Sequence, residues 1–461
     1  MKKSNLLIEG APVSPSLTSI LDSENTQTKK TETKKRLLTV SFFAFLIAIC
    51  VSFIAKLLAL LINAFTNLSF FGKFSLSYES PANNTLGPLV IVVPALGGLT
   101  VGLIAFYGSK AIRGHGIPEA MEQILTNQSK IKPSVTFLKP LSSAISIGTG
   151  GPFGAEGPII ATGGALGSTV GQLIRISHYE RKILLAAGAT AGMSAIFGSP
   201  LAAIFLALEL LLFEFSVRSL LPVAIACVTG AAGHHLLFGH GAVFAMPDVA
   251  MPSNIALAIY TGIGIFVGLM SVGVSKAIYL VEEMFEKLPV HWMWWPAIGG
   301  LIVGLIGYFF PNTLGVGYDN ITKVLSGQLQ MTLILSLCVF KFFSWAIALG
   351  SGTSGGTMAP LLTIGGAMGA LMGLLLVTYF PQAKISLPLA ALVGMAAMFS
   401  GASRALLTSI VFAMETTMQS HALLPLLGAC LASYLVSYFL MEHNIMTEKI
   451  ARRGVKTPHT Y

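Results

Sequence analysis

Charged side chains are scarce in this sequence. Asp, Glu, Lys and Arg together make up only 10% of the 461 residues, against roughly 25% in an average soluble domain. Hydrophobic residues account for 54%, and the mean hydropathy is +0.77. This balance excludes an ordinary soluble domain, because there are too few charges to cover its surface, and it favours a membrane protein.

Cysteine is also rare, and residues 1–28 lack the short apolar core and the cleavage site of a signal peptide. All four cysteines, Cys50, Cys227, Cys338 and Cys430, lie inside apolar runs. Such cysteines behave as small buried hydrophobes, so they indicate nothing about the cellular compartment. We expect residues 1–36 to form a disordered cytosolic tail.

The apolar part of the chain extends from Leu37 to Met441, in runs of about 15 to 25 residues. These runs provide a dozen or more segments, and several are too short or too interrupted by glycine to cross a bilayer alone. The sequence therefore predicts an all-α polytopic membrane protein that contains tilted and half-spanning broken helices.

The net charge of +9 is concentrated at the two ends of the apolar region. Five of the eight residues over 29–36 are basic, and Lys449, Arg452, Arg453 and Lys456 lie close together near the C-terminus. Basic residues that flank membrane segments remain on the cytoplasmic side. We therefore expect both termini in the cytoplasm, an even number of crossings and no nucleic-acid partner.

Two stretches of the chain are variants of each other. Residues 156–168 (EGPIIATGGALGS) match 358–370 (MAPLLTIGGAMGA) at an offset of 358 − 156 = 202. Residues 192–209 likewise resemble 394–415, with a four-residue insertion, and these stretches end on Glu209 and Glu415. The duplication predicts a first repeat over 37–250, a second repeat over 251–441, and a C-terminal helix end with a short tail over 442–461.

A glycine-rich approach precedes each of the first two stretches, and a proline follows two residues later, at Pro158 and Pro360. This composition is typical of a helix that begins abruptly. A helix that begins inside a membrane presents unpaired N–H groups and a positive dipole end to whatever lies in front of it. Two such starts at equivalent places predict an anion site near the middle of the membrane.

Three motifs identify the family that this chain resembles. They are Gly114-His115-Gly116-Ile117-Pro118, Gly154-Ala155-Glu156-Gly157-Pro158 and Gly356-Thr357-Met358-Ala359-Pro360. In this order they resemble the signatures of the CLC family of chloride channels and chloride/proton antiporters, in its bacterial form without cytosolic CBS domains. The resemblance implies two inverted-topology repeats in a lipid bilayer and a homodimer with one pore per subunit. It also implies chloride held by helix N-termini, with no cofactor.

The resemblance assigns a gate and a set of anion contacts. Glu156 occupies the position of the external gate, where a carboxylate competes with chloride for the amides of a helix N-terminus. Backbone N–H groups of Gly157, Thr357 and Met358 are expected to contact the anion. Those of Gly114, His115, Gly116 and Ile117 are expected at the inner mouth.

Several departures from the family pattern bear on mechanism. The inner proton glutamate of the antiporters is replaced by Leu210, and the tyrosine that contacts the central chloride is replaced by Met446, whose thioether donates no hydrogen bond. His115 replaces a serine and can charge near neutral pH, and Ala155 replaces an arginine. These changes favour a passive chloride channel without proton exchange, and a chloride/proton antiporter with an atypical inner proton route is the alternative.

The remaining polar residues have simpler interpretations. Glu209 is a helix-end structural partner or part of a proton path, and Glu214 is an exposed cytosolic residue or a substitute proton relay. Lys139 can supply positive potential near the pore, and Lys341 can do the same or extend toward the membrane surface. His234, His235 and His240 lack further ligands, so no metal site is predicted.

A distant alternative is an intramembrane serine protease. Gly352-Thr353-Ser354-Gly355-Gly356 fits the nucleophile pattern G-x-S-x-G. Such an enzyme needs a histidine beside the serine, and His421 and His443 have no evident carboxylate partner. We therefore do not expect an enzyme.

Overall fold

The computed structural model describes residues 15–174, 176–327 and 330–455. Within this part of the chain the regular structure is helical, and the β-type pairing consists of two isolated bridges, Gly114 with Ser354 and Gly154 with Gly356. Eight of the helices are long and apolar enough to cross a membrane. The prediction of an all-α, multi-pass membrane protein is confirmed.

The first half contains eight α-helices and one π-helical turn. In chain order they are α1 (Pro15–Phe71), α2 (Val92–Tyr107), α3 (Ile117–Thr126), α4 (Val135–Gly148), α5 (Glu156–Leu173), α6 (His178–Phe197), α7 (Pro200–Leu206), the π-helical turn η4 (Ala207–Leu212) and α8 (Val217–Leu237).

The second half repeats this order. It contains α9 (Asn254–Glu286), α10 (Trp295–Phe309), α11 (Tyr318–Leu325), α12 (Met331–Leu335), the π-helical turn η7 (Ser336–Phe340), α13 (Lys341–Gly350), α14 (Met358–Tyr379), α15 (Leu387–Ser403), α16 (Leu406–Thr417) and α17 (Leu423–Leu440). A last short helix, α18 (Glu448–Arg452), follows.

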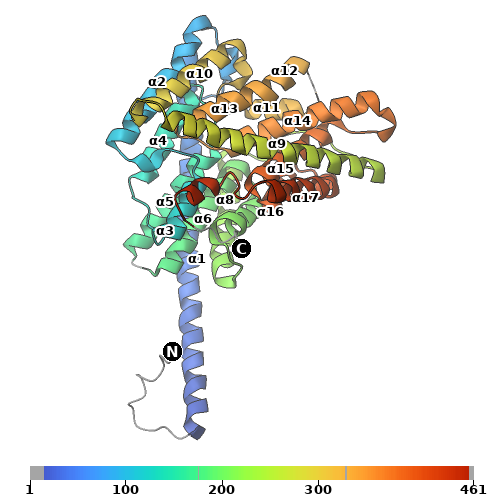
Figure 1. Ribbon diagram of the computed structural model, residues 1–461. Coiled ribbons are helices and arrows are strands. Elements are labelled where there is room, and N and C mark those ends of the chain that lie inside the picture. The colour runs from blue at the N-terminus through green and yellow to red at the C-terminus, as the bar shows by residue number, and fades with distance from the viewer. Residues whose placement is uncertain (1–14, 175, 328–329, 456–461) are drawn as a thin grey trace.

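Equivalent helices of the two halves pack in equivalent ways. Helix α5 packs on α6 as α14 packs on α15, and α2 lies against its counterpart α10 (Figure 1). Helix α7 lies against its counterpart α16 in the same way. The two halves meet at Gly154 and Gly356, which form an antiparallel bridge at the repeat offset of 356 − 154 = 202. An antiparallel contact between equivalent residues places the pseudo-two-fold axis between them, so the predicted inverted repeats are visible at this point.

Close packing of the paired helices depends on small residues. A side chain at Gly167 would collide with the Leu184 carbonyl on α6, and one at Gly369 would collide with the Ala390 carbonyl on α15. Apolar lipid does little to drive helices together, so membrane helices associate through such close contacts. The glycines within α5 and α14 therefore serve packing, whereas those before the two helices belong to the region described next.

The N-terminal boundary differs from the expectation. Helix α1 begins at Pro15 and projects from the helical body (Figure 1), so residues 15–36 are helical rather than a disordered tail. Between Ser16 and Phe71 the chain contains no proline or glycine. Extending an existing helix is easier than starting a new one, which accounts for the difference. Residues 1–14 and 456–461, with Lys456, lie outside the described residues.

Candidate anion pathway and gate

Glu156 is the first residue of α5, and its carboxylate lies at the N-terminus of α14. Glu156 is buried, with only 1% of its surface exposed. The Ala359 N–H donates a hydrogen bond to Glu156 Oε1 at 2.7 Å. The carboxylate of one repeat thus occupies the amide end of the equivalent helix in the other repeat, where a bound anion would be stabilised by the same groups.

The second partner of this carboxylate is Tyr318, which begins α11. Its hydroxyl donates to Glu156 Oε2 at 3.0 Å. The ring of Tyr318 packs edge-on against Phe197 and Phe244, with ring centroids 5.8 Å away in both cases. Phe412 also contacts Phe197, at 4.9 Å. These four residues form an aromatic cluster that holds the Tyr318 ring beside the Glu156 carboxylate.

Neither Tyr318 nor the Ala359 amide was among the residues predicted from the sequence. The prediction assigned the anion contacts to Gly157, Thr357 and Met358, one residue short of Ala359. A signal for Tyr318 exists in the duplication, because Gly315-Val316-Gly317-Tyr318 corresponds to Gly114-His115-Gly116-Ile117 at an offset of 318 − 117 = 201.

Three backbone segments converge beside Glu156. A side chain at Gly157 would collide with the His115 carbonyl and with Gly356, and one at Gly116 would collide with the Gly157 carbonyl. Gly114 and Gly116 have positive φ angles of 101° and 100°, which favour glycine. The structure therefore brings together the three predicted motifs, and glycine is required because the backbones are in direct contact.

Two of the predicted inner contacts need correction. The Gly116 N–H donates to Glu119 Oε2 at 2.6 Å, and the Gly114 N–H donates to the Thr353 carbonyl at 3.4 Å. In this structure neither amide is available to an anion, because the Glu119 side chain in the first turn of α3 and the Thr353 carbonyl of the facing loop occupy them. Of the four residues predicted there, this leaves His115 and Ile117.

The loop from 112 to 116 is held by Lys139. The Lys139 ammonium donates to the carbonyls of Ile112 and Gly114 at 2.8 and 2.9 Å. This residue is only 1% exposed. Its hydrogen bonds give it a structural role that the sequence did not reveal, and its contribution to positive potential stays a prediction.

His115 lies in the same loop and is buried. Its Nδ1 atom has no hydrogen-bond partner among the described residues. Burial lowers the pKa of His115 from 6.5 to about 4. Burial alone would raise the pKa of the neighbouring Glu119, but Lys449, His115 and Lys139 together with the Gly116 amide lower it to about 2. At neutral pH this part of the loop therefore contains a neutral imidazole beside a charged carboxylate.

Glu209 and Glu415 each cap the helix that leads to the other glutamate. Glu209 accepts hydrogen bonds from the N–H groups of Leu407 and Thr408 at 2.8 and 3.0 Å, at the start of α16. Glu415 accepts those of Leu201 and Ala202 at 3.0 and 2.9 Å, at the start of α7. This reciprocal capping agrees with the structural interpretation of Glu209.

The positions associated with proton transfer and central chloride contact are apolar and enclosed. Leu210 in η4 is 2% exposed, and Met446 is fully buried. The Met446 N–H donates to Asn444 Oδ1 at 2.8 Å, and its side chain is part of the hydrophobic core. Glu214 lies after η4, where its carboxylate is 3.9 Å from the Lys182 ammonium and partly exposed.

Within the described part of the chain, the structure brings together neither a serine protease active site nor a metal site. The Ser354 hydroxyl is hydrogen bonded to Ser143 at 2.7 Å and to Ser142 at 3.3 Å, so its partners are serines on α4 rather than a general base. The rings of His235 and His240 stack at 4.9 Å. Among the described residues, no group of three or more His, Cys, Asp or Glu side chains could hold a metal ion.

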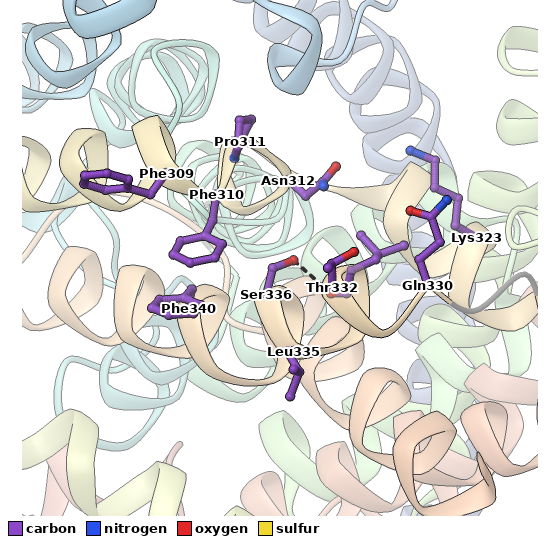
Figure 2. A pocket seen from close by; sticks show the side chains of 11 residues that line it. Phe309, Phe310, Pro311, Asn312, Lys323, Gln330, Thr332, Leu335, Ser336 and Phe340 are labelled. Carbon is purple, nitrogen blue, oxygen red and sulfur yellow. Dashed lines mark hydrogen bonds between the residues drawn. The ribbon is translucent and has the colours of Figure 1, made fainter.

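A cavity of about 960 Å³ lies away from the gate, between the end of α10 and the start of α12. Figure 2 shows Phe310 and Phe340 on one side of it and Lys323 with Gln330 on the other. The two phenylalanine rings stack at 3.6 Å. None of the predicted site residues is among the residues that line it, so the gate is not part of this cavity.

Comparison with known proteins agrees with this fold. The family model for voltage gated chloride channels matches residues 96–438. The H(+)/Cl(-) exchange transporter ClcA of Yersinia pestis is 29% identical over 379 residues, which cover 80% of this chain and 79% of that protein. A ClcB-like protein of Ralstonia nicotianae is 28% identical over 366 residues, with 78% of this chain and 85% of that protein covered.

Solved structures share the same fold. A slow cyanobacterial Cl⁻/H⁺ antiporter superposes with a TM-score of 0.78 at 23% identity, and 90% of this chain and 99% of that chain are covered. A eukaryotic CLC transporter superposes with a TM-score of 0.74 at 20% identity, with 91% and 74% covered.

The inverted repeats, the buried carboxylate at a broken-helix N-terminus and the three glycine motifs define an anion transport protein of the membrane. The family model covers well over half of the chain, and the chain belongs to the voltage gated chloride channel family, the CLC family. It is a CLC-type chloride transport protein.

Proposed function

We propose that this protein exchanges chloride for protons and that Glu156 is the residue at which the two ions compete. The observation that carries the proposal is the position of the Glu156 carboxylate on the Ala359 amide at the N-terminus of α14. Relatives about 29% identical are named H(+)/Cl(-) exchange transporters, which supports the same function.

The coupling follows from the chemistry of this position. An ionised carboxylate and a chloride ion need the same amide donors, so they cannot occupy them together. A proton neutralises the carboxylate and weakens its attraction to the helix N-terminus. Chloride binding at this position therefore favours a protonated Glu156 that has moved away, and each transport cycle carries a proton with the side chain.

Uncoupled chloride conduction is the second candidate, and Leu210 is the observation that favours it. A buried leucine cannot relay protons from the inner side. Exchange then needs another acceptor, for which we propose Glu214, since it follows η4 and its side chain is partly exposed.

The assembly and its orientation are part of the proposal. We propose a homodimer in a bacterial inner membrane, with one pore per subunit and both termini in the cytoplasm. Large apolar residues such as Val228 on α8 and Leu431 on α17 are exposed on the isolated subunit, 59% and 48% respectively. Lipid or a second subunit must cover such side chains in a membrane.

Simultaneous chloride and proton flux from purified protein in liposomes tests the function. An outward chloride gradient should drive protons uphill at a fixed ratio. Glu156→Gln should retain chloride transport and lose both the proton movement and most of the pH dependence. Chloride flux without uphill proton movement in the parent would establish conduction instead, and loss of coupling in Glu214→Gln would identify the inner acceptor.

A further inference from the structure

The two halves contain a matching pair of buried lysines. Lys341 follows Lys139 at the repeat offset of 341 − 139 = 202. Lys139 donates to the carbonyls of Ile112 and Gly114, and Lys341 donates to the carbonyls of Thr313 and Gly315 at 3.0 and 2.7 Å. Each lysine thus holds a Gly-X-Gly loop that leads directly into a short helix, α3 in the first half and α11 in the second.

The two loops end on different residues. The first helix begins with Ile117, and the second begins with Tyr318, whose hydroxyl contacts the gate carboxylate at 3.0 Å. Gly315 and Gly317 have φ angles of 65° and 76°, so the segment that aims Tyr318 is in a conformation that favours glycine. A Cβ at Gly317 would lie 3.4 Å from the Lys341 ammonium, which shows how closely the lysine lies against this segment.

We infer that Lys341 is a positioning residue of the gate. Its two hydrogen bonds fix the 313–317 loop, the loop fixes the start of α11, and the start of α11 holds the Tyr318 hydroxyl on Glu156. Lys341 is fully buried, and its ammonium is bonded to two carbonyls, so it acts on the gate through the backbone. This inference rests on the proposed role of Glu156.

Other charged and titratable groups around the gate must be considered in any pH experiment. Tyr318 contacts the carboxylate directly. Elements packed around it also carry charged or titratable groups, among them His115 before α3, Glu119 on α3, Lys139 on α4, Glu180 and Arg181 on α6, Asp319 and Lys323 on α11, and Lys341 on α13. A direct electrostatic effect of the Lys341 charge on Glu156 is therefore the alternative that the test has to separate from positioning.

The test is a double-mutant cycle on the pH dependence of chloride flux in liposomes. Lys341→Met should release the loop and move the midpoint to higher pH, as Tyr318→Phe does, because either change deprives the ionised carboxylate of a donor. In the Lys341→Met/Tyr318→Phe double variant the shift should be no larger than in Tyr318→Phe alone. A full additional shift in the double variant would show that Lys341 acts through its charge and would overturn the inference.

A matched control and an independent variant complete the design. Lys139→Met removes a buried lysine and the same two hydrogen bonds from the equivalent loop, which does not carry Tyr318. Any shift that it causes reports the loss of a nearby positive charge, and this shift should be smaller than that of Lys341→Met; an equal shift would show that Lys341 also acts through its charge. Gly315→Ala keeps the Lys341 charge but adds a Cβ at a residue with positive φ and 3.0 Å from Pro81 Cγ. It should shift the midpoint in the same direction, and it serves if Lys341→Met does not fold.

The outcomes also separate this inference from the proposed function. If Glu156→Gln keeps the parent's pH dependence, the role of Glu156 fails. If Glu156→Gln loses that dependence but neither Lys341→Met nor Gly315→Ala moves the midpoint, the gate stands and the positioning role of Lys341 is wrong.

Discussion

Removing one hydroxyl from the gate should change the pH at which transport is activated. Tyr318→Phe deletes the donor that lies 3.0 Å from Glu156 Oε2 and leaves the Ala359 amide in place. A hydrogen bond to a charged group contributes about 1.5–3 kcal/mol, and one pH unit corresponds to about 1.4 kcal/mol. The midpoint of activation should therefore rise by about 1 to 2 pH units, because the protonated carboxyl becomes relatively more favourable.

The measurement is chloride efflux from liposomes over a series of symmetric pH values. Tyr78→Phe is the matched control, because the Tyr78 hydroxyl donates to Asp319 at 2.9 Å, next to Tyr318, without contacting Glu156. The control should retain the parent's midpoint. A Tyr318→Phe midpoint equal to that of the parent and of Tyr78→Phe would refute the argument that the hydroxyl stabilises the ionised gate.

Two further predictions concern residues near the pathway. Burial lowers the pKa of His115 from 6.5 to about 4. Between pH 6.5 and pH 4 the histidine is therefore protonated in the unfolded chain but not in the folded chain. The free energy of unfolding should fall as the pH drops through this range. In His115→Ser, thermal unfolding in detergent should show a smaller loss of stability over this pH range. In a second measurement, the pH response of chloride flux should be the same in Glu156→Gln and in the Glu156→Gln/His115→Ser double variant. A different response in the double variant would establish His115 as a pH sensor. Glu209→Ala and Glu415→Ala should each lower the free energy of unfolding by about 1 kcal/mol through loss of a helix cap, with proton coupling retained. Lost coupling at unchanged thermal stability would place the affected glutamate in a proton path.

Much of the site could be predicted because the duplication and the glycine motifs are local features of the sequence. Glu156 and the two abrupt helix starts follow from residue types at fixed spacing, and the resemblance to the CLC family implied that the three motifs line one anion path. The partners of the carboxylate do not, because Tyr318 and Ala359 are separated from Glu156 by 162 and 203 positions along the chain. Likewise, Gly114 and Gly116 were predicted as anion contacts, but in the structure their N–H groups donate to the Thr353 carbonyl and to the Glu119 carboxylate, respectively.

The sequence by itself determined the class of this protein. Low charge and long apolar runs require a membrane environment, and a repeat offset of 202 residues with broken-helix starts requires two similar halves around a polar centre. Only the tertiary structure decided how these parts act on one another. The antiparallel pairing of Gly154 with Gly356 sets the carboxylate of one repeat on the helix end of the other, and the Lys341 loop brings Tyr318 to the same carboxylate. Hydrogen bonds are directional and short, so contacts between residues far apart in sequence exist only after the two halves have packed.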